Sequence, residues 1–216
     1  MARKVGSAGK TLARRLGRIA LVLLGFGFAV WLLVQLFAPW MGALALPLAF
    51  LAVMRLLQDK EVEREVVAKA RGYLGEARVG RVLEALPSPW RVFHDVDLGG
   101  ENADHVVVGP AGVFNVEVKN YTGLIRATPQ GLWVRGERRD DLVRQAWRQA
   151  HKLRERLGVE VEPLLVFVGG RLEGRRVGRL PVLPPEEVGA YLRGLPARLS
   201  FTEAQRVSKL LEGRVR

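Results

Sequence analysis

The chain has 216 residues, contains no cysteine and carries 34 Lys and Arg against 22 Asp and Glu, a net charge of +12. This length allows one ordinary domain with additional segments, and the missing cysteines exclude disulfides, thiolate zinc sites and a cysteine nucleophile. Six basic residues and no acidic residue lie in positions 1–18, which leaves 28 basic against 22 acidic residues, a balance that permits a polyanionic partner without requiring one.

Two apolar runs follow this basic tail. Ile19 to Ala38 has about the length that crosses a bilayer as a helix. The second run, Met41 to Met54, extends to Leu57 if the charged end of Arg55 reaches the membrane surface. It is short for a span and contains Pro47, so a re-entrant or tilted helix is an alternative there. A secretory signal peptide does not fit, because the first run is too long and lacks a small-residue cleavage site. Basic residues flank the pair on both sides, which by the positive-inside rule places both ends in the cytoplasm. We predict a transmembrane hairpin over residues 19–57 of a multi-pass inner-membrane protein.

A polar helical segment over residues 58–71 is predicted to link the membrane to a folded domain. Two glycines, Gly72 and Gly75, should break or bend this helix. Beyond them, apolar residues recur at helical spacing on one stripe: Val79, Leu83 and Leu86. Glu76 shares that stripe, where a carboxylate is costly unless it is paired or bound to a metal. It is either a first-turn carboxylate favoured by the helix dipole or an additional anchor of a site.

The most informative stretch is Asn102 to Lys119. Two alternating, β-branched runs flank the turn Gly109 to Gly112, a pattern typical of an antiparallel hairpin. If these four residues form the turn, Asp104 lies directly opposite Glu117. Because side chains alternate along a strand, Lys119 shares the face of Glu117. The hairpin therefore predicts two carboxylates and one ammonium group side by side.

Two opposed carboxylates repel each other, so a divalent cation with oxygen ligands, Mg²⁺ or Mn²⁺, is expected between Asp104 and Glu117. This chemistry suits hydrolysis of a phosphodiester, in which the metal lowers the pKa of a bound water and neutralises charge on the phosphorus, while Lys119 positions or deprotonates that water. The alternative is a surface hairpin whose Glu117–Lys119 pair is merely solvated.

The remaining elements are shorter or less chemically informative. His94 and His105 are expected to be structural, with His105 buried and hydrogen-bonded. The predicted strands and helices outside the hairpin are a strand over 90–96, a short strand pair over 124–128 and 132–135, a helix over 140–157, a buried strand over 163–168, an edge strand over 180–183, a helix over 185–192 and a final helix capped by Ser200 and Glu203.

The helix over 140–157 has a strongly basic exposed face. Arg144, Arg148 and Lys152 on this face could contact the phosphates of a nucleic acid. A solvated arginine-rich surface explains the same pattern equally well. Gln145 lies at the edge of the buried stripe, where it could orient a water molecule or a ligand.

Residues 102–123, Asn-Ala-Asp-His-Val-Val-Val-Gly-Pro-Ala-Gly-Val-Phe-Asn-Val-Glu-Val-Lys-Asn-Tyr-Thr-Gly, resemble the central motif of the NERD (nuclease-related) domain of the PD-(D/E)xK nuclease-like superfamily. Gly75-Glu76 resembles the Gly-Glu helix motif of that family, and Gln145 its downstream glutamine. The similarity covers roughly residues 72–170. The sequence departs from the family at Ala103, where a larger aliphatic residue is usual, and at Asp141-Leu142, where Asn-Pro is usual.

The resemblance implies an α/β, restriction-endonuclease-like mixed sheet flanked by helices, here preceded by two membrane helices. The domains would be a tail over 1–18, a membrane hairpin over 19–57, a linker over 58–71 and a NERD domain over 72–216. It further implies that Asp104, Glu117 and the Val118 carbonyl bind the metal, and that Lys119, Glu76 and Gln145 serve catalysis.

Two functions follow from this reading of the chain. The first is a membrane-anchored, metal-dependent nuclease facing the cytoplasm, whose partners are the lipid membrane and a nucleic acid, with DNA favoured over RNA. The second is an idle membrane-tethered module that binds nucleic acid or acts as a scaffold and needs no metal. The complete Asp104, Glu117 and Lys119 set is what an active enzyme requires, and it favours the first function.

Overall fold

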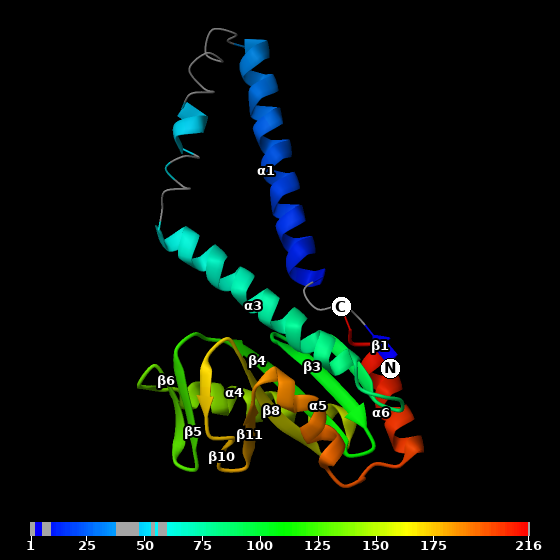
Figure 1. Ribbon diagram of the computed structural model, residues 1–216. Coiled ribbons are helices and arrows are strands. Elements are labelled where there is room, and N and C mark those ends of the chain that lie inside the picture. Colours follow the sequence, from blue (N-terminus) through cyan, green and yellow to red (C-terminus); the bar gives the residue numbers. More distant parts are fainter. Residues whose placement is uncertain (1–2, 6–9, 38–47, 53–54, 56–59, 216) are drawn as a thin grey trace. The chain divides into compact units, whose positions relative to one another are not determined.

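The computed structural model describes residues 3–5, 10–37, 48–52, 55 and 60–215 (Figure 1). The chain divides into two compact units, one made of Met1–Gly9 with Gly72–Arg216 and the other of Lys10–Arg71. The second unit contains helix α1, Lys10–Phe37, and the beginning of helix α3, Lys60–Glu84. The first unit contains both β-sheets.

Within the part of the chain that the structure describes, no helix has both the length and the apolar character that a bilayer span needs. Most of the second apolar run, Met41 to Leu57, lies outside the described residues. The membrane hairpin over residues 19–57 therefore stays a prediction without support from the structure.

The larger sheet has seven strands and mixed parallel and antiparallel pairing. Its order is β1-β2-β3-β4-β8-β11-β10, with a parallel β4–β8 pair at its centre. The bounds of these strands are β1 Arg3–Val5, β2 Arg91–Asp97, β3 Asn102–Gly109, β4 Gly112–Asn120, β8 Val161–Val168, β11 Leu180–Leu183 and β10 Arg176–Val177.

A second, four-stranded sheet follows β4 in the chain. Its order is β7-β6-β5-β9, with β5 Leu124–Thr128, β6 Gly131–Val134, β7 Glu137–Arg138 and β9 Arg171–Glu173. One face of this sheet is apolar and packs against α4 and β8 through a buried cluster that includes Ile125, Leu132 and Phe167. The predicted short strand pair is confirmed here, because β5 and β6 pair antiparallel around their turn.

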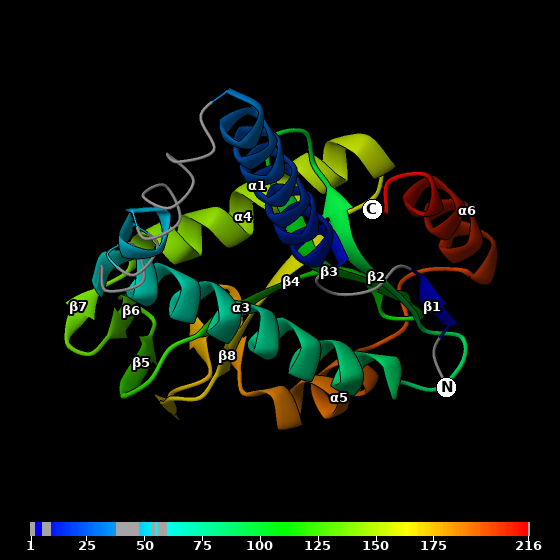
Figure 2. The same ribbon diagram turned by 90° about the horizontal axis from the view of Figure 1, so that it is seen from above.

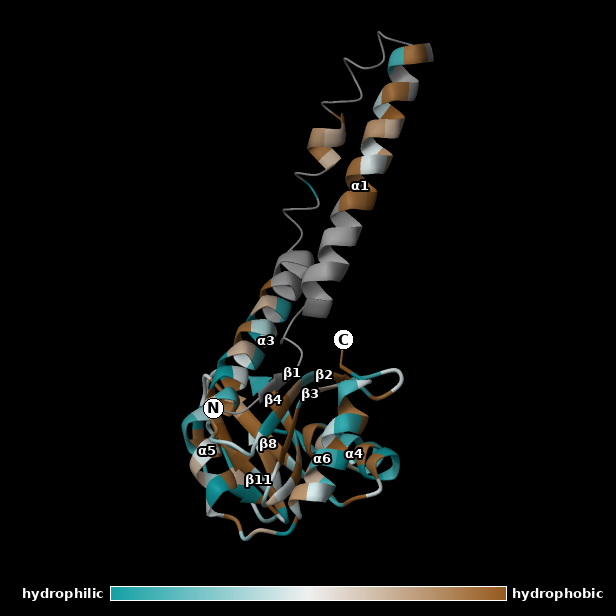
Figure 3. Ribbon diagram, turned by 90° about the vertical axis from the view of Figure 1, so that its right-hand side faces the viewer, coloured by the Kyte–Doolittle hydropathy of each residue, from teal (hydrophilic) through white to brown (hydrophobic). Residues whose placement is uncertain are grey.

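Helices cover both faces of the larger sheet (Figure 2). The end of α3 and helix α5, Pro185–Gly194, pack on one face through residues such as Leu83, Leu164 and Leu192. Helices α4, Asp140–Leu157, and α6, Phe201–Glu212, pack on the opposite face. Figure 3 shows that hydrophobic residues line the strands between these layers. The fold is thus an α/β arrangement of mixed sheets flanked by helices, compatible with a nuclease-like domain.

Two local expectations are wrong. Leu180–Leu183 is not at the edge of the sheet, because β11 pairs with β8 on one side and with the two-residue strand β10 on the other. Helix α3 does not break at Gly72 or Gly75 but runs unbroken to Glu84. A Cβ at Gly75 would lie 3.1 Å from the Cβ of Asn120, so this glycine lets the helix approach the end of β4.

Candidate active site

The β3–β4 hairpin has the register that its turn residues predict, with Gly109 paired to Gly112 and His105 to Val116. The same register, continued by one residue, places Asp104 opposite Glu117. There the backbone N–H of Val118 donates to Oδ2 of Asp104 over 2.7 Å. The aspartate side chain therefore takes the place of a backbone partner where the ladder ends.

Glu117 projects from β4 toward helix α4, and only 2 % of it is exposed. Its Oε1 accepts hydrogen bonds from the Lys119 ammonium group at 2.6 Å and from Nε2 of Gln145 at 2.7 Å. Within the described part of the chain, its other oxygen, Oε2, is buried without a hydrogen-bond partner. A buried carboxylate oxygen without a partner is costly, so this atom is available to a ligand.

The electrostatics of the site follow from this crowding. Burial, followed by the nearby charges of Glu117 and Glu76, raises the pKa of Asp104 well above its ordinary value. Burial alone would lower the pKa of Lys119, but the charge and hydrogen bond of Glu117 outweigh it and raise that pKa. Lys119 therefore carries its proton at neutral pH, and burial beside other acids disfavours the charged form of Asp104.

Glu76 reaches the same site from helix α3 and is half-buried. Burial, followed by the charges of Asp95 and Glu117, raises its pKa to about 7. A carboxyl group that titrates near neutrality beside two other acids is characteristic of functional sites. The structure thus brings Glu76, Asp104, Glu117, Lys119 and Gln145 together, as the sequence predicts.

Asp95 belongs to this acidic group, and the sequence analysis missed it. It lies on β2 between His94, which pairs with His105, and Val96, which pairs with Ala103. Its φ of 55° is in the left-handed region, which is strained for a residue other than glycine. Oδ1 of Asp95 accepts a hydrogen bond from Nδ2 of Asn102 over 2.7 Å. The sequence could have revealed Asp95 only through the pairing of β2 with β3, because that register sets Asp95 opposite Asp104.

His94 and His105 are structural, and the prediction of a buried, hydrogen-bonded His105 is confirmed. Their Nδ1 atoms lie 2.8 Å apart, and Nε2 of His105 lies 3.2 Å from the carbonyl oxygen of Glu76. Burial, followed by the charge of His94, lowers the pKa of His105 to about 3. Because a carbonyl only accepts, the neutral His105 must donate through Nε2 and accept at Nδ1 from His94. The pair fits against Gly80, where a Cβ would lie 3.3 Å from Cε1 of His94.

A divalent cation requires several oxygen ligands, and the candidate site offers a small set. Among the residues described, no three or more His, Asp or Glu side chains are arranged to hold a metal ion. The predicted set is smaller, with two carboxylates and the carbonyl of Val118. All are hard oxygen donors of the kind that Mg²⁺ and Mn²⁺ prefer. Among the described residues, Oε2 of Glu117 has no hydrogen-bond partner and could therefore bind the ion. Since the N–H and C=O of a strand residue face the same edge, the Val118 carbonyl also faces Asp104. The residues fit the ion.

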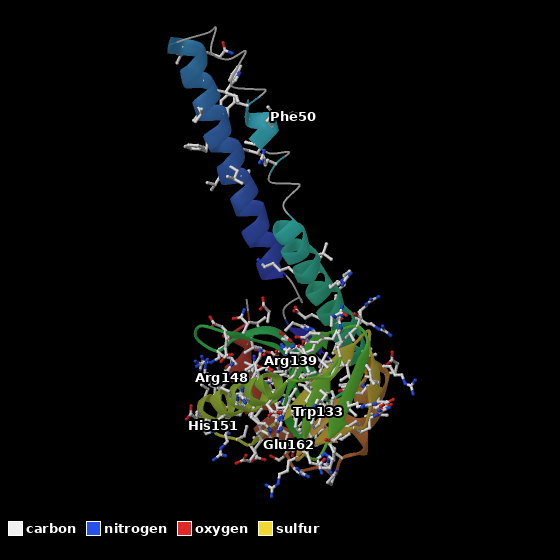
Figure 4. All side chains as sticks on the ribbon, turned by 90° about the vertical axis from the view of Figure 1, so that its left-hand side faces the viewer. Phe50, Trp133, Arg139, Arg148, His151 and Glu162 are labelled. Atoms are coloured by element: carbon white, nitrogen blue, oxygen red, sulfur yellow. The ribbon has the colours of Figure 1, made fainter. Side chains whose placement is uncertain are left out.

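The three predicted phosphate-binding residues lie on α4, of which Arg148 is labelled in Figure 4, but two of them share one acidic partner. Oε2 of Glu101 lies 3.0 Å from Nη2 of Arg148, and its Oε1 lies 2.6 Å from Nζ of Lys152. The hydrogen bond from Arg148, with that from Lys152, lowers the pKa of Glu101 to about 2. Arg144 is exposed. A phosphate that binds Arg148 or Lys152 must therefore compete with Glu101.

Comparisons with known proteins relate part of this chain to a described family. The family model of the nuclease-related domain (NERD) matches residues 71–168. An uncharacterized protein of Bacillus anthracis is 35% identical over 103 residues, which are 44% of this chain and 48% of that protein. The chain thus spans about half the length of this curated relative. The solved structure of Pyrococcus furiosus SfsA in complex with Ca²⁺ is 12% identical, with 66% of this chain and 54% of that chain covered, but the TM-score of 0.25 is too low to relate the two folds.

Proposed function

Starting from the nuclease-related domain at residues 71–168, we propose that this protein is a metal-dependent nuclease that hydrolyses phosphodiester bonds of nucleic acid. The observation that carries the proposal is the arrangement of Asp104, Glu117 and Lys119 at one end of the β3–β4 hairpin. The two carboxylates repel each other, and a cation bound between them would remove this repulsion. It would also supply a partner for Oε2 of Glu117, which is buried and lacks a hydrogen bond within the described residues.

Mg²⁺ or Mn²⁺, held by Asp104, Glu117 and the Val118 carbonyl, would supply an activated water and neutralise charge on the phosphate. The remaining roles belong to the side chains of the chain itself. Lys119 carries a proton and lies 2.6 Å from Glu117, so it can donate a hydrogen bond to the attacking water or to a phosphate oxygen. Gln145 holds the Glu117 carboxylate in one orientation. Glu76, with a pKa of about 7, can take up or release a proton near neutral pH.

The test is cleavage by the full chain, purified in mild detergent and supplied with Mg²⁺ or Mn²⁺. Single-stranded, double-stranded and branched DNA and RNA are offered separately. Lys119→Met should keep metal binding nearly intact and slow cleavage roughly 10²-fold or more, as expected for the loss of a proton-transfer or charge-stabilising group. Asp104→Ala should remove metal binding, measured by calorimetry, together with cleavage. If none of the four substrates is cut faster by the parent than by Lys119→Met, the nuclease proposal fails.

We further propose that helix α1 attaches the protein to the inner membrane, with the nuclease-related domain in the cytoplasm. Large apolar side chains along α1 are exposed, among them Leu21, Phe26 and Leu36, and such a row needs an apolar environment. Cysteines introduced at Ser7 and at the exposed position Glu160 should resist a membrane-impermeant thiol reagent in intact cells and react after lysis. Labelling of either cysteine from outside would exclude this topology.

An idle binding module is the second candidate, and one observation favours it. Oε1 of Glu117 is already satisfied by Lys119 and Gln145, so half of this carboxylate is stabilised without any cation. This candidate predicts that nucleic acid binds equally well with and without Mg²⁺ and that no substrate is cut. The cleavage assay above separates it from the nuclease.

A further inference from the structure

The outer face of the smaller sheet, which follows strand β4 in the chain, forms a hollow. A cavity of about 360 Å³ is lined by five residues that we call the stacking face: Leu124, Arg126, Thr128, Trp133 and Gly136. This volume is within the range of cavities that hold small ligands. The opposite face of the sheet is buried in the core, so only this one is available to a partner.

The chemistry of the stacking face combines an aromatic ring with cations. Arg126 pairs directly across the strands with Trp133, and the guanidinium carbon of Arg138 lies 5.7 Å from the centre of the Trp133 ring. Trp133, which is labelled in Figure 4, is half-buried, which fixes its ring while leaving part of it open. Fixed aromatic rings among arginines are what proteins use to hold unpaired bases, with the bases stacked and the phosphates paired.

The charge of this segment is positive. From Tyr121 to Arg139 the chain carries four arginines and one glutamate. Arg126 pairs with Glu173 at 3.2 Å, and Arg138 with Asp140 at 2.8 Å. Both pairs are well exposed, and exposed ion pairs contribute little stability. A phosphate can therefore replace these carboxylates at small cost.

Side-chain interactions lead from Lys119 toward the stacking face. Tyr121 lies just beyond the end of β4 at Asn120 and is close enough to Lys119 to help raise the pKa of that lysine. The guanidinium carbon of Arg139 lies 5.3 Å from the centre of the Tyr121 ring, and the next residue back, Arg138, covers Trp133. Lys119, Tyr121, Arg139, Arg138 and Trp133 thus form a succession of charged and aromatic groups, in which Tyr121 also packs against the buried cluster beneath the smaller sheet.

We propose that the stacking face binds an unpaired segment of single-stranded nucleic acid, with one base stacked on Trp133 and the neighbouring phosphate paired with Arg126. This inference rests on the proposed nuclease function, since it assigns the substrate class of that same site. It predicts that the protein prefers single strands, or duplexes with an unpaired end, over continuous duplexes.

The test measures equilibrium binding to fluorescent oligonucleotides by anisotropy, with the full chain in mild detergent and EDTA present so that no cleavage occurs. The probes are a single-stranded 20-mer of DNA, the same sequence in RNA and the blunt DNA duplex. Trp133→Ala should weaken single-strand binding about 5- to 100-fold, the effect of losing one stacked base, and should leave duplex binding unchanged. Trp133→Phe should keep most of the affinity, because a phenyl ring still stacks.

Matched controls come from helix α4. Trp147→Ala removes another exposed tryptophan, 43% exposed and away from the stacking face, and should leave single-strand binding unchanged. Arg126→Ala should weaken single-strand binding and lower its dependence on salt, whereas Arg154→Ala should do neither. The inference is overturned if Trp133→Ala binds single strands as tightly as Trp147→Ala, or if the parent binds the blunt duplex more tightly than the single strand.

The outcome is separable from that of the nuclease proposal. If single-strand binding depends on Trp133 but no substrate is cleaved, the nuclease proposal is rejected and the proposed role of the stacking face is supported. If the parent cleaves nucleic acid and Trp133→Ala cleaves it equally fast, the nuclease proposal is supported and the proposed role of the stacking face is rejected. If Trp133→Ala does not fold, tryptophan fluorescence gives a second measurement. The single strand should quench the fluorescence of the parent and should cause less quenching in Trp133→Phe. Equal quenching in the two proteins would contradict stacking on Trp133.

Discussion

Nε2 of Gln145 donates a hydrogen bond to Oε1 of Glu117 over 2.7 Å, which joins helix α4 to strand β4 at the candidate site. One turn further along the helix, Gln149 makes the corresponding contact with Asn115, whose Nδ2 lies 3.0 Å from its Oε1. The two glutamines are thus chemically alike but differ in what they touch. Gln145 supports a carboxylate of the site, and Gln149 supports a neutral amide in the core.

Replacing each of these two glutamines by leucine, in separate variants, should distinguish an effect on cleavage from an effect on stability. Gln145→Leu should slow cleavage by about tenfold, because the Glu117 carboxylate loses a donor that orients it, and should change the melting temperature little. Gln149→Leu should leave the pH profile of cleavage unchanged and cost about 1–3 kcal/mol of unfolding free energy, because the buried amide of Asn115 loses its acceptor. Thermal melts and initial rates of both variants give the answer. Equal effects of the two changes on both quantities would contradict this division.

Asp104→Asn should be neutral or stabilising when no metal is present. The raised pKa of Asp104 means that the folded protein disfavours the charged form, and an asparagine oxygen can still accept from the Val118 N–H. Asp104→Ala should instead destabilise by about 1–3 kcal/mol, because that N–H loses its partner. Chemical unfolding in EDTA at pH 7.5 distinguishes the two. A clear loss of stability in Asp104→Asn would mean that the charged aspartate has a structural partner.

Glu76 should make the metal-free protein less stable as pH rises toward neutrality. Its pKa in the folded protein is about 7, above the ordinary value of 4.5, so the folded state binds this proton more tightly than the unfolded chain. The resulting stabilisation is fully present below pH 4.5 and is lost as pH rises through 7, to a total of at most about 3 kcal/mol. Unfolding free energies measured from pH 4.5 to 8 should therefore fall less steeply in Glu76→Gln. Glu160→Gln, a change at an exposed position, should keep the slope of the parent.

Glu101→Gln should strengthen nucleic-acid binding. The Glu101 carboxylate holds Arg148 and Lys152, and its removal frees both cations for phosphate. We expect affinity to rise several-fold at low salt and the salt dependence to steepen by about one to two phosphate contacts. Anisotropy titrations at a series of salt concentrations measure both quantities. An unchanged salt slope would show that these two residues do not contact the phosphates.

Local pattern was sufficient for the elements whose contacts are close in sequence. The register of the β3–β4 hairpin follows from its turn, and the bounds of α4, Asp140–Leu157, agree with the predicted helix because its apolar residues repeat every three to four positions. The position of β11 could not be predicted, since a two-residue strand such as β10 has no periodicity of its own. Asp95 was hidden for a different reason, because its left-handed backbone, with φ of 55°, interrupts the regular alternation of β2. The contact between Glu101 and Arg148 joins residues that are distant in sequence, and it forms only after α4 packs on the sheet.

The placement of the site along the chain also constrains how fast the domain can fold. Asp104 and Glu117 meet across a short hairpin, which forms on a microsecond scale, whereas the β4–β8 pairing joins Val113 to Val161 and must close a much longer loop. The two acidic groups therefore face each other before Gln145 is delivered by α4. Removal of one of these two charges should therefore accelerate refolding as well as slow unfolding. Stopped-flow refolding in EDTA should be faster for Asp104→Asn than for the parent, and an unchanged refolding rate would show that the two acidic groups do not yet face each other in the transition state.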